Sequence, residues 1–308
     1  MRKKGIISSL ILLIIFMCGC FQKEKSILLQ YKYQSGEILK YKFSNISKGI
    51  ITTEGLPILG TSTSPIEVLM ETSCKFTQKV TGIEEGGVAN IDFSYDSFEQ
   101  DIKTPIFSQK QVNPFFNLLE GKSLNIKVGK DGSLLKQIGI EEIPGQIPEN
   151  IQQELIPKFK AEWEKNIVTL IERSYQRFPL EEMKVGDSWI RELSYNIPLL
   201  GTTRGKFTYT IEKWTQIRGI ECVQVGIEAN LTVSEREPFV FPQEIDISKV
   251  TFNGAAQGKG KMIFAYQQGR LMSNDLEMDV KMQVNYSQPE RELKMNLDFK
   301  TQTLLELE

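Results

Sequence analysis

The side chains that could do chemistry in this sequence are few, and histidine is absent. Without imidazole the chain has no Ser-His or Cys-His catalytic pair and no histidine-bearing zinc or haem site. Ser133 and Lys136 have the Ser-x-x-Lys spacing of acylating enzymes, but the partner motifs are missing and strand alternation predicts opposite faces for them. We therefore expect no catalytic residue, and an enzyme that uses carboxylates or a Ser-Lys pair is only a third alternative.

Two further groups of polar residues have structural explanations. Residues 121–123, Gly-Lys-Ser, look like the end of a phosphate-binding loop, but Phe116 stands where that loop needs its first glycine. Asp92, Ser94 and Asp96 share one face of a predicted strand, and an exposed polar face explains them without calcium or a glycosidase pair. We expect no metal ion and no cofactor.

The first twenty residues have the pattern of an export signal. Arg-Lys-Lys at residues 2–4 precedes an apolar run from Ile6 to Met17, which is about half the length of a membrane-spanning helix. A basic start, a short apolar run and small residues before a cleavage site predict a secretory signal peptide over residues 1–19.

Residues 17–20, Met-Cys-Gly-Cys, resemble the bacterial lipobox, in which a diacylglycerol is attached to the cysteine thiol and cleavage leaves that cysteine as residue one. The resemblance implies that Cys20 is lipidated, since buried acyl chains can hold a soluble domain at a bilayer. Residues 20–27 would then form a tether. The expected location is the cell envelope: the outer membrane if the cell has two membranes, as Phe21 indicates, and otherwise the outer face of the plasma membrane.

The overall composition is that of a globular protein, with 40% hydrophobic and 25% charged residues. Lys and Arg number 37 against 39 Asp and Glu, and this balance argues against a nucleic-acid partner. Beyond Cys20 only Cys74 and Cys222 remain. An exported protein could join them in a disulfide, but buried free thiols are the commoner case.

Segments of the first half recur in the second half in the same order. Pro57–Ser62 recurs as Pro198–Thr203, and Tyr33–Leu39 has its counterpart in Met183–Trp189. Further pairs follow in order, so we predict two tandem copies over residues 28–147 and 179–308.

Each copy has the alternation of antiparallel β structure. From Asp275 to Tyr286 the apolar residues take every second position, which predicts a long half-buried strand. Between the copies, residues 148–178 instead show helical spacing, with Ile151, Leu155 and Phe159 on one face. The expected fold class is mainly β (α+β): two tandem antiparallel β repeats that form curved sheets or half-barrels, with a helical insert between them.

This arrangement resembles the half-barrel lipoproteins that carry or receive lipids in bacterial envelopes, although no residue carries over. The chain is more closely similar to a family of uncharacterised bacterial lipoproteins. Tyr31 to Phe43 reads Tyr-Lys-Tyr-x-x-Gly-Glu-x-Leu-x-Tyr-x-Phe. Leu119 to Gly132 matches a central Leu-x-Gly-x-x-Leu-x-Ile-x-Val-x-x-x-Gly segment, and Val185 to Trp189 reads Val-Gly-Asp-Ser-Trp. This resemblance implies no known activity.

The predicted function is therefore that of a membrane-anchored lipoprotein that binds or carries an apolar ligand such as a lipid. Met278, Met282 and Met295 share the inward side of the last strands, where flexible, polarizable side chains can adapt to apolar ligands. Leu59 and Leu200 lie in the recurring Pro-x-Leu-Gly-Thr loops and are further candidates. The alternative is a structural or scaffolding lipoprotein that binds another envelope protein.

Overall fold

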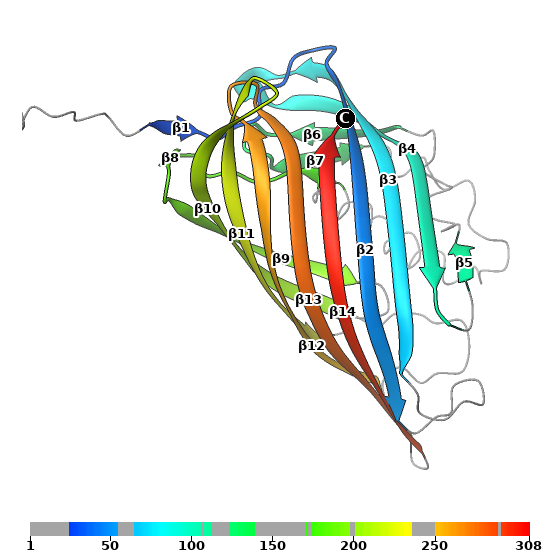
Figure 1. Ribbon diagram of the computed structural model, residues 1–308. Coiled ribbons are helices and arrows are strands. Elements are labelled where there is room, and N and C mark those ends of the chain that lie inside the picture. Colours follow the sequence, from blue (N-terminus) through cyan, green and yellow to red (C-terminus); the bar gives the residue numbers. More distant parts are fainter. Residues whose placement is uncertain are drawn as a thin grey trace, which may run out of the picture.

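The computed structural model describes residues 25–54, 65–105, 108–111, 123–138, 171, 174–197, 201–235, 250–288 and 291–308. These residues are almost entirely β-strand, as the alternating pattern predicts (Figure 1). The strands are β1 Ser26–Leu28, β2 Ile38–Glu54, β3 Ile66–Ile83, β4 Ala89–Lys103, β5 Ser108–Gln111, β6 Ser123–Val128, β7 Leu134–Ile138, β8 Glu182–Lys184, β9 Ser188–Ile197, β10 Gly201–Ile217, β11 Ile220–Glu235, β12 Val250–Ala265, β13 Arg270–Gln288 and β14 Arg291–Leu307.

Twelve strands form one open antiparallel sheet in the order β7-β6-β4-β3-β2-β14-β13-β12-β11-β10-β9, with β5 paired to β4. The pairing of β2 with β14, from Tyr41 opposite Leu307 to Glu54 opposite Lys294, joins the two ends of the chain at the centre of this sheet. A small separate ribbon pairs β1 with β8. The long strands curve as they cross the molecule (Figure 1).

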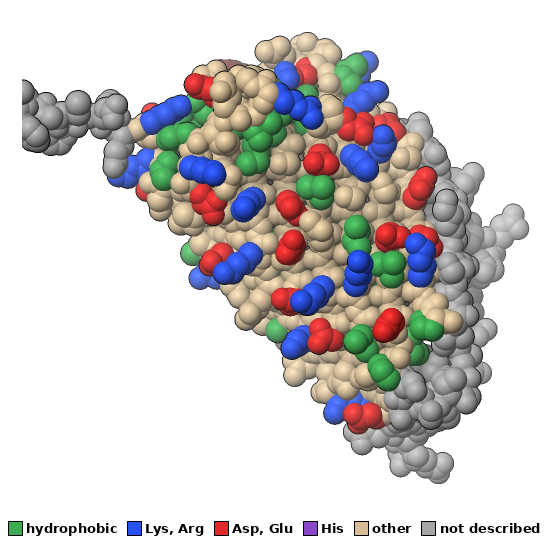
Figure 2. All heavy atoms as spheres, in the orientation of Figure 1, with side chains coloured by type: hydrophobic (Ala, Val, Ile, Leu, Met, Phe, Trp, Pro, Cys, Tyr) green, Lys and Arg blue, Asp and Glu red, His purple; other side chains and the backbone are tan. Residues whose placement is uncertain are grey.

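Strand alternation gives the sheet two chemically different faces. Ile91, Phe93 and Tyr95 of β4 and Phe207 and Tyr209 of β10 are all buried. We call the face that carries these buried side chains the inner face, and the opposite one the outer face. Charged side chains of both signs are spread over the outer face (Figure 2), so the sheet buries one face and solvates the other.

Two glycine turns at one end of the sheet make the same main-chain hydrogen bonds. Gly36 N–H donates to the Val80 carbonyl oxygen, and Gly186 N–H donates to the Ile211 carbonyl oxygen, both at 2.8 Å. Val80 and Ile211 each donate back to the acidic residue that follows the glycine, at 2.9 Å. Both glycines have a positive φ, which favours glycine because a side chain would be strained there.

Apart from β1 and β8, the described strands of both halves belong to one sheet, and the division into tandem copies stays a prediction. Most of the predicted helical segment, residues 148–178, lies outside the described residues. Within it, Ile171 and Ser174 are helical, whereas residues 175–178 are not, so the helical pattern does not continue to the proline that follows. Within the described part of the chain, no helix has the length and apolar character needed to span a bilayer.

Candidate ligand-binding face

The inner face of β13 and β14 carries a continuous set of apolar side chains. Three successive cross-strand pairs contribute to it: Val280 with Phe299, Met282 with Leu297, and Val284 with Met295. Met278 extends the set by one position on β13. We call these seven residues the apolar ladder: Met278, Val280, Met282, Val284, Met295, Leu297 and Phe299. Within it Met282 is buried and the other six side chains are half-buried, so apolar surface remains open to a ligand.

Glycines on the neighbouring strand β12 make room for two of the ladder methionines. Gly258 pairs with Met278 and Gly254 pairs with Met282. A Cβ built on Gly258 would lie 2.6 Å from the Met278 Cγ, and one on Gly254 would lie 3.0 Å from the Met282 Cγ. The two methionine side chains therefore lie over strand β12, in space that a residue larger than glycine at position 254 or 258 would occupy.

A belt of uncharged polar side chains crosses the inner face next to the ladder. Thr303 and Asn45 form one cross-strand pair, and Thr301 and Ser47 form the next pair toward the ladder. Asn45 Nδ2 donates to Thr303 Oγ1 at 3.3 Å, Ser47 Oγ donates to Asn45 Oδ1 at 3.0 Å, and the Ser47 and Thr301 hydroxyl oxygens lie 3.0 Å apart. We call these four residues the polar belt.

The row of polar side chains that contains the belt continues onto β3 and β4. Thr72 lies opposite Asn45 on β3, and Gln100 lies opposite Thr72 on β4. Gln100 Nε2 lies 3.4 Å from Thr72 Oγ1, at the long end of the hydrogen-bond range. One transverse row of the sheet thus presents hydroxyl and carboxamide groups over four adjacent strands.

No charged residue occupies an inner-face position on the five central strands. On β12, β13 and β3 the inner-face positions are the even-numbered residues, from Val250 to Phe264, from Asn274 to Val284 and from Ile66 to Val80. On β14 and β2 they are the odd-numbered residues, from Met295 to Leu307 and from Leu39 to Thr53. The charges of the same strands lie on the outer face, where Lys300 and Asp279 approach to 3.9 Å. The described residues contain no cluster of Asp, Glu and Cys suited to a metal ion.

At the glycine-turn end, an aromatic cluster fills the inner face. Tyr31 stacks on Tyr33 at 5.7 Å between ring centroids and meets Phe178 and Phe264 at 5.5 Å each. The Tyr31 hydroxyl accepts a hydrogen bond from the Gln176 N–H at 2.9 Å. Because the ring is buried, the pKa of the Tyr31 phenol lies well above its usual value. This end is a packed core.

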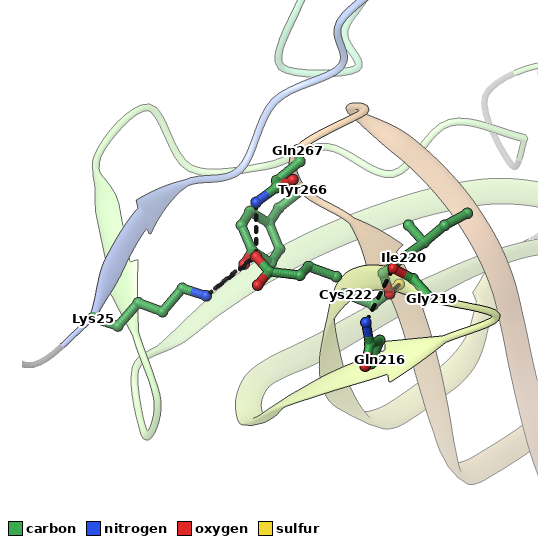
Figure 3. A network of polar contacts seen from close by, with 8 residues as sticks. Lys25, Gln216, Gly219, Ile220, Cys222, Tyr266 and Gln267 are labelled. Atoms are coloured by element: carbon green, nitrogen blue, oxygen red, sulfur yellow. Dashed lines mark hydrogen bonds and ion pairs between the residues drawn. The ribbon is translucent and has the colours of Figure 1, made fainter.

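The N-terminal strand is attached to the sheet by a lysine contact. Figure 3 shows Lys25, the residue before β1, pointing toward Tyr266, to whose hydroxyl its Nζ donates a hydrogen bond. The same Nζ lies 4.8 Å from the ring centroid of Trp214 and 3.7 Å from Glu221 Oε2. The hydrogen bond to Tyr266 is the main reason that the pKa of Lys25 is raised, so this contact keeps its positive charge.

The structure places three of the predicted site residues together. Met278, Met282 and Met295 all lie on the inner face, in the apolar ladder. Cys20, Leu59 and Leu200 lie outside the described residues. The catalytic-like Ser133 stands in the turn before β7, where its hydroxyl donates to Asp131 Oδ1 at 2.6 Å. Cys74 and Cys222 are buried free thiols on β3 and β11.

The polar belt was missed by sequence reasoning. The sequence does contain a sign of the belt, because its four polar residues occupy inward-facing positions of their strands: Asn45, Ser47, Thr301 and Thr303. Polar residues at inward positions break the apolar alternation and resemble loop or edge composition until the pairing partner is known. The pairing of β2 with β14, which brings them together, joins residues far apart in the sequence.

The described strands form an open antiparallel sheet whose five central strands carry no charged residue at their inner-face positions. A model described as "Family of unknown function (DUF6263)" matches residues 86–269, and the chain belongs to this family. No curated protein matches the chain. Among solved structures, one described as "Lipid-protein interactions in lipovitellin" has a TM-score of 0.45 at 10% identity, over 90% of this chain and 25% of that one. The chain thus spans about a quarter of that relative's length.

Proposed function

We propose that this protein binds an apolar ligand, such as a lipid, on the inner face of its sheet while a lipid on Cys20 holds it at a membrane. The apolar ladder is the observation that supports the ligand site. Six of its side chains are half-buried and adjoin one another across β13 and β14. Such a continuous apolar surface on a concave sheet is typical of a ligand site.

The driving force for such binding is the removal of apolar surface from water. Each methylene of an acyl chain contributes about 0.8 kcal/mol when it is buried. Met278, Met282 and Met295 are unbranched and can change rotamer, so the face can adapt to chains of different length and branching. Because no inner-face position on the central strands is charged, a bound chain meets no unpaired ion there.

The membrane anchor is inferred from the lipobox-like residues 17–20. Lys25, held by Trp214 and Tyr266, is the fifth residue after Cys20. Five extended residues span at most about 17 Å. An acylated Cys20 would therefore keep the β1 end of the sheet close to the bilayer.

The ligand site is tested with the mature chain, secreted behind a cleavable signal with Cys20→Ser so that it carries no anchor lipid. We expect organic extraction to release a stoichiometric lipid, identified by mass spectrometry, and the delipidated chain to bind the neutral probe N-phenyl-1-naphthylamine. Met278→Ala combined with Met295→Ala should weaken probe binding about tenfold, because both side chains lose ligand contacts. Ile50→Ala, which removes an exposed outer-face side chain, should leave binding unchanged.

A clean extract together with no probe fluorescence would contradict ligand binding and favour a scaffolding lipoprotein. Equal loss of binding in Ile50→Ala and in the methionine variant would show that the inner face is not the site. Thermal unfolding of each variant establishes that the compared proteins are folded.

The anchor is tested in the full-length chain by metabolic labelling with an alkyne-bearing fatty acid. We expect Cys20→Ser to abolish labelling and release the protein from the membrane fraction. Cys18→Ser is the matched control, since it removes the neighbouring thiol and leaves Cys20 in place. Retention of Cys20→Ser in the membrane fraction would exclude Cys20 as the anchor.

A further inference from the structure

We infer that the polar belt receives an uncharged polar group of the ligand, so that the substrate class is a neutral acyl ester such as an acylglycerol and not a free fatty acid. This inference rests on the proposed function. It concerns Asn45, Ser47, Thr301 and Thr303, which lie directly beside the apolar ladder: Thr301 is opposite Met278, and Thr303 is opposite Leu276. A chain lying along the ladder would bring its end group to this row.

The chemistry of the belt indicates which end group would fit. Hydroxyl and carboxamide groups both donate and accept hydrogen bonds. Each bond within the belt engages only part of that capacity: the Asn45 amide nitrogen donates to Thr303, and its second proton has no partner among the described residues. Ester carbonyl oxygens accept hydrogen bonds from such protons, and glycerol hydroxyls can both donate and accept hydrogen bonds. Neither group needs a counter-ion.

A second polar atom lies one row beyond the belt. Asn274 is on the inner face of β13, opposite Leu305 and next to the row of Leu276 and Thr303. Its Oδ1 is buried and has no hydrogen-bond partner among the residues that the structure describes. A buried acceptor without a donor costs stability, and a ligand hydroxyl placed beyond the belt could donate to it. A carboxylate has no proton to donate.

The described inner-face positions beside the belt provide no cation for a charged lipid end group. A carboxylate or phosphate bound here would find no Lys or Arg partner at the described inner-face positions of β12, β13, β14, β2 and β3, which are all uncharged. An unpaired charge in such a place is strongly disfavoured. The inner face would therefore distinguish neutral from charged lipids in two ways, because it disfavours a charged end group and binds a neutral one.

The experiment compares 1-monodecanoylglycerol with decanoate, which share the same acyl chain, by displacement of N-phenyl-1-naphthylamine from the mature Cys20→Ser chain. At pH 8 we expect the ester to bind at least about tenfold more tightly, because the decanoate charge is unpaired on this face. The difference should shrink as the pH is lowered toward about 4.5, where the carboxylic acid takes up its proton.

Variants of the belt assign the preference to these residues. Thr301→Val keeps the shape and the strand preference of the side chain but removes the hydroxyl, and Ser47→Ala removes its partner. Each should reduce the ester preference about threefold or more while probe binding is retained. Ser44→Ala is the matched control on the same strand, since Ser44 has the opposite, outward phase.

The outcomes separate this inference from the proposed function. Binding of ester and decanoate with equal affinity at pH 8 would overturn the neutral-ester assignment and leave the apolar site intact. Probe binding with the full ester preference retained in both Thr301→Val and Ser47→Ala would overturn the role of the belt. Failure of the probe, the ester and decanoate to bind at all would overturn the proposed function itself.

Discussion

The main-chain N–H of Lys32 donates to the carbonyl oxygen of Gly269 at 3.3 Å, which attaches the N-terminal segment to the turn between β12 and β13. The preceding residue, Tyr31, donates to the Lys130 carbonyl oxygen at 2.7 Å, in the turn between β6 and β7. The chain leading from the predicted anchor thus passes between a turn of the first half and a turn of the second. It connects strands that lie far apart in the sheet order.

Gly269 should be among the least replaceable glycines because of this contact. It has φ +65°, and a Cβ there would lie 2.2 Å from the Lys32 nitrogen. Gly219 is a matched control, since its φ is +81° but nothing lies within 4 Å of an added Cβ. We expect Gly219→Ala to lower the free energy of unfolding by about 1–2 kcal/mol, and Gly269→Ala to cost a further 1–3 kcal/mol, roughly. Urea unfolding measures both, and equal costs would contradict the clash.

The ion pair between Glu37 and Arg270 provides a second connection between the two halves. Glu37 is 8% exposed and follows the first glycine turn, whereas Arg270 begins β13. Its counterpart after the second glycine turn, Asp187, accepts the Lys184 N–H at 2.9 Å. We expect Glu37→Gln to destabilise the protein by about 1–3 kcal/mol.

The matched variant for this prediction is Asp187→Asn, whose amide oxygen can still accept the Lys184 N–H. We expect it to cost less than about 1 kcal/mol. Denaturation at low and high salt measures both variants. A cost for Asp187→Asn as large as that for Glu37→Gln would show that the turns, and not the ion pair, determine stability.

The local structure of the sheet followed from its sequence, whereas the long-range pairing did not. Alternation gave the correct inward phase for Met278, Met282 and Met295, because one face of a strand must be buried. The same alternation contains no information on which strand lies alongside. Nothing local indicates that Ser47 meets Thr301, since strand pairing depends on the whole arrangement of the sheet.

The polar contacts of the N-terminal segment were equally hidden from sequence reasoning. Lys25 reads as an ordinary tether residue, and its contact with Tyr266 depends on a turn formed much later in the chain. Single residues that contact distant elements carry no periodic signal. The apolar part of the candidate site was therefore predictable, while its polar belt and the attachment of the tether were not.

The two remaining cysteines should be unreactive in the folded protein. Burial raises the pKa of the Cys74 thiol to about 12, and burial also raises the pKa of Cys222. The thiolate is the reactive form, so at pH 8 neither thiol should react quickly with Ellman's reagent. In the mature Cys20→Ser chain we expect slow native labelling and two rapidly reacting thiols after unfolding in guanidinium.

Single replacements assign the thiols, because Cys74→Ser and Cys222→Ser should each leave one reactive group after unfolding. A denatured, unreduced chain with no reactive thiol would show that the two cysteines form a disulfide. Rapid labelling of the native chain would show that the strands around them open readily.

Buried tyrosines should make the fold sensitive to alkaline pH. Burial raises the pKa of Tyr31, Tyr33, Tyr41, Tyr95 and Tyr175 well above the ordinary value of 10.0. Above pH 10 the unfolded chain therefore loses phenolic protons that the native state keeps. The native state then binds more protons, so the free energy of unfolding must fall as the pH rises.

We expect tyrosinate absorbance at 295 nm to rise in one cooperative step, together with loss of near-ultraviolet circular dichroism, and not residue by residue.

Tyr33→Phe removes one of these phenols, whose hydroxyl is buried without a hydrogen-bond partner among the described residues. It should leave stability at pH 7 unchanged or slightly higher and move the alkaline transition upward. Tyr41→Phe is the contrasting variant, because it loses the bond to the Leu271 carbonyl oxygen and should lower stability at pH 7. Gradual ionisation without unfolding would mean that these phenols reach water in the native state.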